Sequence, residues 1–126
     1  MIEHANIEDA EEILVLQKLA YESEARLYND WNIPPLTQSI ESIKSAFVDF
    51  VILKNMHEDV IVGSVRAKMT EGICEIGRLI VHPNHQRQGI GSELLSQIEK
   101  EFRPVKKYEL FTGSLSVANL NLYKRN

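Results

Sequence analysis

One stretch decides the fold of this chain: Leu79-Ile80-Val81-His82-Pro83-Asn84-His85-Gln86-Arg87-Gln88-Gly89-Ile90-Gly91-Ser92. The apolar, β-branched residues up to Val81 predict a strand, Pro83 ends it, and Gly89 precedes a helix. The first N–H groups of a helix have no intrahelical partner and lie at the positive end of its dipole. Glycines let a ligand approach such an end closely. We therefore expect the N–H groups of residues 88–92 to face a pyrophosphate, with the Ser92 hydroxyl beside them.

A plain connection between a strand and a helix is the alternative for this stretch, with Gly89 and Gly91 only relieving crowding. The common nucleotide motifs fit the residues badly. There is no Gly-x-x-x-x-Gly-Lys-Ser/Thr here, and Leu94 occupies the place of the third glycine in Gly-x-Gly-x-x-Gly. The glycines alone leave both interpretations open.

Hydrophobic periodicity on either side of this stretch predicts the element order β-α-α-β-β-β-α-β-α. Asn6 is the expected N-cap of the first helix, with Asp9 at its third position. The expected elements are an extended start over 1–5, helices over 7–28 and from about 39 to 47, strands over 48–53, 60–69 and 73–81, a helix from 89 to about 103, a strand over 108–112 and a last helix from 116. This is an α/β (α+β) layer fold with a mostly antiparallel meander followed by a β-α-β crossover.

The strand over 60–69 alternates, which predicts a hairpin with one polar side. One face is expected to hold Ile61, Gly63, Val65, Ala67 and Met69, and the other Ser64, Arg66 and Lys68. Turns are expected at Met56 to Asp59 and at Glu71-Gly72.

Length and composition indicate one globular domain over 1–126, because 126 residues with 44% apolar and 25% charged side chains are ordinary values for one domain. The net charge of −4 argues against a nucleic-acid or anionic-membrane partner. No apolar run approaches the roughly 20 residues that span a bilayer, and the N-terminus does not read as a signal peptide. The single cysteine, Cys74, forms no internal disulfide, which fits a cytoplasmic location.

The string Val81-His82-Pro83-x-x-Gln86-Arg87-x-Gly89-Ile90-Gly91 resembles the acetyl-CoA-binding motif of the GCN5-related N-acetyltransferases, the GNAT family. Gln86, Gly89 and Gly91 take the three defining places of that motif. Asn119 to Lys124 resembles the Asn-x-x-x-Tyr segment of the same family, and the element order matches from the first strand to the last helix. The resemblance covers essentially the whole chain and implies the GNAT fold, with acetyl-CoA as cosubstrate.

The resemblance assigns cofactor-binding roles to one run of residues. Backbone groups of Leu79, Ile80 and Val81 would pair with the amides of pantetheine. The pyrophosphate would be held by Gln86, Arg87, Gln88, Gly89, Ile90, Gly91 and Ser92, and Asn119 would be turned towards the cofactor. The Arg87 side chain either adds charge near a phosphate or points to solvent.

The resemblance also implies a mechanism, in which the acetyl group moves directly from the thioester to an amine. The amine must lose a proton, and the departing thiolate must gain one. Tyr123 matches the tyrosine that acts as general acid, and packing of the last helix is its alternative role. Glu75 is a candidate base or a solvent-facing strand carboxylate. Cys74 has no obvious catalytic partners.

Candidates for the acceptor side are Glu24 on the first helix, and Tyr28 and Trp31 in the region that walls this site in the family. A solvated helix face is the alternative for Glu24, and packing onto the core for Tyr28 and Trp31. Arg78 either pairs with an acidic substrate group or forms an ion pair on the sheet. His82 and His85 are not expected to bind metal, because no further ligands stand at suitable spacing.

The expected function is that of an acetyl-CoA-dependent N-acetyltransferase acting on a primary amine of a small molecule or peptide, in the cytoplasm, with a possible homodimer. The alternative is a CoA-binding module of the same fold that acts as a sensor or partner without turnover. Family members continue past the tyrosine segment with two more strands, whereas this sequence stops at Asn126. We therefore expect the chain to be a domain truncated at its C-terminal end, without the closing strands.

Overall fold

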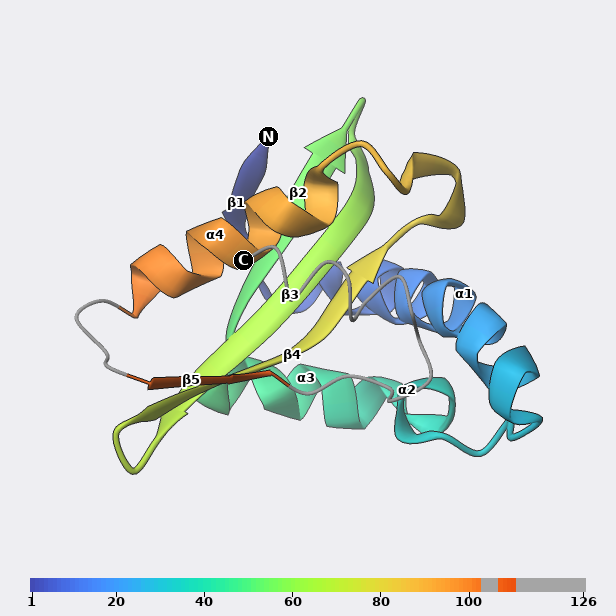
Figure 1. Cartoon of the computed structure of the whole chain (residues 1–126), viewed down its shortest axis with the longest axis horizontal. Coiled ribbons are helices and arrows are strands. Elements are labelled where there is room, and N and C mark those ends of the chain that lie inside the picture. Colours follow the sequence, from blue (N-terminus) through green and yellow to red (C-terminus); the bar gives the residue numbers. More distant parts are fainter. Residues whose placement is uncertain (103–106, 111–126) are drawn as a thin grey trace.

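A five-stranded sheet in the order β1-β2-β3-β4-β5 forms the centre of the computed structural model, which describes residues 1–102 and 107–110 (Figure 1). The strands are β1 (Ile2–His4), β2 (Val51–His57), β3 (Val60–Thr70), β4 (Ile73–Val81) and β5 (Lys107–Leu110). Strands β1 to β4 pair antiparallel, and β5 runs parallel to β4. The expected mixed α/β fold is confirmed, and the expected last helix from Ser116 lies outside the described residues.

Helices cover both faces of the sheet (Figure 1). They are α1 (Ala10–Tyr28), α2 (Pro34–Thr37), α3 (Ile40–Asp49) and α4 (Ile90–Glu101), with short 3-10 turns at Ile7–Asp9 and Pro83–His85. Helices α1 and α3 pack on one face and α4 on the other, so the described part of the molecule has three layers.

The 3-10 turn Ile7–Asp9 that leads into α1 is capped by Asn6, the N-cap that the sequence predicts, and it is also tied to the sheet. The Asn6 side chain accepts a hydrogen bond from the Glu8 N–H at 2.9 Å, and Asp9 Oδ2 accepts one from the Asn6 N–H at 3.0 Å. Lys54 Nζ on β2 donates to the same Asp9 oxygen at 2.9 Å. Burial alone would raise the pKa of Asp9, but the Asn6 N–H and Lys54 outweigh it and lower that pKa. The ion pair therefore holds the beginning of α1 against β2.

The expected strand over 48–53 begins too early, and the expected turn from Met56 is also wrong. Helix α3 continues to Asp49 because the Phe50 N–H closes its last turn on the Ala46 carbonyl at 2.9 Å. Val48 is 85% exposed and lies on the solvent side of this helix. Strand β2 then extends to His57, and only the two residues 58 and 59, both with positive φ, form the turn.

The expected polar side of the hairpin is also wrong, because α1 and α3 cover that face of the sheet. Ser64 is only 3% exposed, and its hydroxyl donates to the Leu53 carbonyl at 2.8 Å. Ile61 packs with the cluster under α1 and α3, whereas Val65 and Ala67 pack with the cluster under α4. A register shift between Asn55 and Met56 of β2 breaks the simple alternation.

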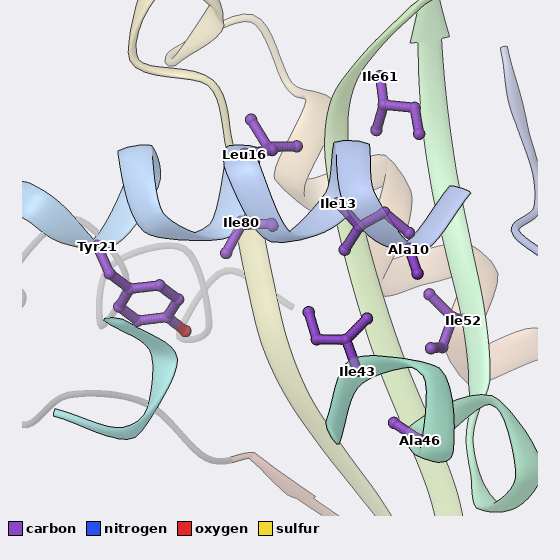
Figure 2. Packing of buried hydrophobic residues seen from close by; sticks show 9 residues of the cluster. All are labelled: Ala10, Ile13, Leu16, Tyr21, Ile43, Ala46, Ile52, Ile61 and Ile80. Atoms are coloured by element: carbon purple, nitrogen blue, oxygen red, sulfur yellow. The ribbon is translucent and has the colours of Figure 1, made fainter. Parts of the chain in front are cut away.

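Two hydrophobic clusters, one on each face of the sheet, form the core. Figure 2 shows the cluster between the sheet and helices α1 and α3, which contains Ala10, Ile13, Leu16, Tyr21, Ile43, Ala46, Ile52, Ile61 and Ile80. The second cluster lies under α4 and contains Leu53, Val65, Ala67, Cys74, Ile76, Leu79, Leu94, Leu95 and Ile98. Burial of these side chains supplies the main driving force for packing the helices on the sheet. It also fixes where α4 begins relative to the end of β4.

Candidate functional site

The second half of β4 has a strand partner on one edge only, within the part of the chain that the structure describes. Strand β3 pairs along the full length of β4, but β5 pairs only with Ile73–Ile76. Residues 77–81 therefore have no described strand neighbour on the β5 side. Backbone groups on such an edge can pair with an extended ligand. The predicted cofactor-binding residues Leu79, Ile80 and Val81 all lie in this half of the strand.

The loop after β4 is held in place by hydrogen bonds around His82. Its N–H donates to the Val62 carbonyl at 2.8 Å, and its Nδ1 accepts from the Asn84 N–H at 3.0 Å. The His85 N–H donates to the His82 carbonyl at 2.8 Å, and the two imidazole rings meet edge to face at 5.7 Å. These contacts give His82 a structural role in shaping the loop.

The N-terminus of α4 is open to solvent. Gly89 is the N-cap at φ 81°, a left-handed conformation that favours glycine, and no side chain caps the helix. The Glu93 N–H donates to the Gly89 carbonyl at 3.0 Å, which is the first hydrogen bond of the helix. The N–H groups of residues 90–92 come before this bond, and the repeating pattern of the α-helix supplies no acceptor for them. Gln86, Arg87 and Gln88 are exposed in front of this end. The strand edge, the loop and the helix end thus form one continuous surface suited to an anionic, extended ligand.

Gly63 of β3 sets the position of the first turn of α4. A Cβ atom at this position would lie 2.8 Å from Ile90 Cγ2, 3.0 Å from Leu94 Cδ1 and 3.3 Å from the Ile80 carbonyl oxygen. Only a residue without a side chain lets the helix approach the strand this closely.

Gly63→Val is expected to destabilise the fold by about 1–3 kcal/mol, because the larger side chain forces α4 away from β3. Denaturant unfolding measures this loss. Ile90→Ala removes the nearest clashing group, so the Gly63→Val/Ile90→Ala double variant should be more stable than the sum of the two single changes predicts. Strict additivity of the two effects would contradict the close approach.

Glu75 lies on β4 before the point where pairing with β5 ends. It is half-buried, and its Oε2 accepts a hydrogen bond from the Thr70 hydroxyl at 3.0 Å. Its neighbours Cys74 and Ile76 belong to the cluster under α4. Because strand side chains alternate, Glu75 is on the opposite face of the sheet.

The predicted acceptor residues lie around the C-terminal end of α1. Tyr28 is the last residue of α1, and Trp31 follows in the loop with half of its surface exposed (50%). Glu24 lies in the second-to-last turn of the same helix. Helix α1 itself packs on the face of the sheet opposite α4 (Figure 1). Tyr123 and Asn119 lie outside the described residues. The structure therefore places the residues predicted to bind the cofactor, 79 to 92, on one surface, and the predicted catalytic pair of Tyr123 and Glu75 stays a prediction.

Cys74 is buried in the core under α4, away from the open loop. Burial, helped by Glu99, raises the pKa of its thiol to about 11. The thiol is therefore protonated at neutral pH, and only the thiolate form is a strong nucleophile.

Two arginines, Arg66 and Arg78, form a basic cluster that faces α1 and α3. The sequence predicts an acidic substrate group or an ion pair on the sheet as the partner of Arg78, and it places Arg66 only on the polar side of the hairpin. Both line a pocket between these helices and the sheet. The amphipathic helices before β2 could have predicted that this face of the sheet is covered, because their apolar sides must pack against a sheet. Side chains in the middle of that face then become buried.

Comparison with known proteins identifies the class of protein that this fold and this loop define. Residues 10–126 match the acetyltransferase (GNAT) family. The chain belongs to this family, whose members use acetyl-CoA as the acetyl donor. The resemblance expected from the loop motif is thereby confirmed.

A curated relative of this chain is UPF0157 protein YqkA of Bacillus subtilis, 26% identical over 122 residues, which are 97% of this chain and 35% of that protein. The chain thus spans about a third of the length of that relative.

Two solved structures share the fold. The PaiA N-acetyltransferase of Thermoplasma acidophilum, in complex with coenzyme A, superposes with a TM-score of 0.85 at 18% identity, covering 100% of this chain and 87% of that chain. The ribosomal-protein-S18-alanine N-acetyltransferase of Escherichia coli superposes with a TM-score of 0.74 at 16% identity, covering 99% of this chain and 74% of that one.

Within residues 1–102 and 107–110, no three His, Cys, Asp or Glu side chains are arranged to hold a metal ion. Of the described helices, none combines the length and the apolar character needed to cross a membrane.

Proposed function

We propose that this chain transfers an acetyl group from acetyl-CoA to a primary amine of a small molecule or a peptide. The observation that supports this most directly is the half-paired strand β4, which runs into the exposed loop and the uncapped N-terminus of α4. Cytoplasmic location and a homodimer belong to the same proposal and rest on family resemblance alone.

The residues of this surface suit the parts of acetyl-CoA. The free edge of residues 77–81 offers backbone groups to the two amides of the pantetheine arm. The exposed residues Gln86 to Gly89, with Ile90, Gly91 and Ser92 in the first turn of α4, offer N–H groups and the positive end of the helix dipole to the pyrophosphate. Asn119 is proposed to orient the cofactor from the last segment of the chain.

The proposed chemistry breaks the thioester C–S bond and forms an amide C–N bond. The attacking amine loses one proton, for which Glu75 is the candidate acceptor, directly or through water. The CoA sulfur gains one proton, for which Tyr123 is the candidate donor. Glu24, Tyr28 and Trp31 are the proposed contacts of the acceptor. The N-acetyltransferases with which this chain shares its fold support transfer to nitrogen.

Release of CoA thiol on incubation with acetyl-CoA and a panel of primary amines tests the proposal. Amine-dependent thiol release supports the enzyme. Thermal stabilisation by acetyl-CoA without release for any amine would contradict turnover and favour the CoA-binding module. Absence of stabilisation by millimolar acetyl-CoA would overturn both interpretations.

A further inference from the structure

Arg78 is turned towards α1 by an irregularity in β4. Pairing between β3 and β4 shifts register between Ser64 and Arg66, and Arg78 has a φ of 49°. In a regular strand Arg78 would lie on the α4 face with Ile76. The extra residue places it instead in the pocket under α1 and α3. Non-glycine residues at positive φ are uncommon and carry strain, which is often found at functional sites.

Arg66 and Arg78 line the same pocket, together with Gln17, Ser64 and apolar side chains from α1, α3 and the sheet. The enclosed part of the pocket has a volume of about 20 Å³, enough for one water-sized group such as a carboxylate oxygen. The guanidinium of Arg66 lies over the Phe50 ring at 4.3 Å, which fixes its plane.

Among the side chains that the structure describes, neither guanidinium group has a carboxylate partner. The ion pairs of the described residues join His4, Lys54, Glu3, Asp9 and Glu101, and none includes either arginine. Glu75, a carboxylate on the same strand as Arg78, accepts a hydrogen bond from the Thr70 hydroxyl. Arg78 Nε is buried and has no hydrogen-bond partner.

Electrostatics make this arrangement costly without an anion. Burial and the neighbouring Arg78 lower the pKa of Arg66 to about 10, and burial lowers the pKa of Arg78 as well. Both groups are still charged at neutral pH. Two half-buried cations that repel each other are stabilised by a shared carboxylate, whose two oxygens match the planar fork of a guanidinium.

The position of the pair points to the acceptor rather than to the cofactor. Arg78 lies two residues beyond Ile76, the last residue of β4 that pairs with β5. It therefore belongs to the part of β4 that is proposed to bind the pantetheine arm, and the thioester is at the end of that arm. The uncapped end of α4, which suits the phosphates, belongs to the layer on the other face of the sheet (Figure 1). An anion at Arg78 is therefore a group of a second molecule.

We infer that Arg66 and Arg78 form a carboxylate-binding subsite, so that the acceptor is an amine that also carries a carboxylate, such as an amino acid or the end of a peptide. This inference rests on the proposed acetyl transfer to an amine. Of the two roles expected for Arg78, the inference favours pairing with an acidic group of the substrate over an ion pair on the sheet.

Matched acceptors that differ only in the carboxylate test the subsite. Nα-acetyl-lysine and its amide present the same ε-amine, and alanyl-alanine and its amide present an α-amine. In at least one pair, kcat/KM for the carboxylate member should exceed that of the amide by about tenfold to a hundredfold. Arg78→Gln and Arg66→Gln should remove most of this preference, because kcat/KM should fall much further for the carboxylate member than for its amide. Lys100→Gln, which removes an exposed cation from α4, should keep the preference.

Thermal unfolding with CoA and the same compounds measures binding without turnover. The carboxylate member should raise the Tm of the wild-type protein more than its amide does, and Arg78→Gln should abolish the difference. If this pattern holds but no amine is acetylated, the subsite stands and the proposed function fails. If acetylation occurs without carboxylate preference in either pair, or Arg78→Gln and Arg78→Lys both keep the preference, the subsite is overturned. Equal Tm shifts from acid and amide would overturn it as well.

Discussion

Gly89→Asp is expected to weaken acetyl-CoA binding by about 100-fold or more, because it places a carboxylate at the helix end that is proposed to hold the pyrophosphate. The φ of Gly89 is 81°, and a Cβ atom there would have nothing within 4 Å. Asp therefore fits the space, and it tolerates this backbone region better than most residues. The loss is expected in ligand affinity more than in fold, and titration of acetyl-CoA by calorimetry or thermal shift measures it.

Gly72→Asp is the matched control for this change. Gly72 lies in the exposed turn between β3 and β4, at a φ of 82° and with nothing within 4 Å of an added Cβ. The Gly72→Asp variant adds the same charge as Gly89→Asp at the same kind of backbone conformation, but away from the loop. Its affinity for acetyl-CoA should therefore stay within about twofold of wild type. Gly89→Asn adds nearly the same volume without the charge and should weaken binding less than Gly89→Asp. Equal losses for Asp and Asn at position 89 would contradict the electrostatic explanation.

Tyr123→Phe is expected to lower kcat by about 100-fold and to leave acetyl-CoA binding nearly unchanged, because a general acid contributes to the rate of proton transfer and not to cofactor affinity. Steady-state rates of thiol release with a productive amine, together with an acetyl-CoA titration, separate the two effects. This prediction rests on the Asn119 to Lys124 segment of the sequence, which lies outside the described residues.

Tyr108→Phe on β5 is the control for loss of a phenol hydroxyl elsewhere in the chain, and it should keep kcat within about threefold of wild type. A general acid also leaves a signature in the pH profile. If Tyr123 is the general acid, kcat should fall at high pH as Tyr123 loses its proton. This fall should disappear in Tyr123→Phe and persist in Tyr108→Phe. An unchanged kcat in Tyr123→Phe would show that another group, or water, protonates the leaving thiolate.

Local signals in the sequence were enough to predict the class of fold and the strand, loop and helix that contain the predicted cofactor-binding residues. Asn6 and Asp9 cap the first helix as expected, because capping depends on residues only three positions apart. The strand, loop and helix from Leu79 to Ser92 also lie as predicted, since Pro83 and Gly89 act on their own neighbourhood. The order of the elements, read along the chain, then agreed with one known family.

Boundaries and faces were less predictable where contacts between distant segments decide them. Val48 reads as a strand residue, but it continues α3 because Ile43 and Ala46 of that helix pack on the sheet. Ser64 and Arg66 read as the polar side of a hairpin. They are covered because α1, some fifty residues earlier, needs an apolar surface for its own buried side.

By itself the sequence determined the layer fold, the family and the loop between β4 and α4, all of which depend on residues close together along the chain. Only the tertiary structure decided which face each arginine occupies. A register shift in one strand turns Arg78 to the same side as Arg66, and two helices then cover the pair, with no described carboxylate side chain paired to either arginine. The physical reason is that the period of a strand assigns side chains to faces only while the pairing stays regular, and a bulge arises from how neighbouring strands pack.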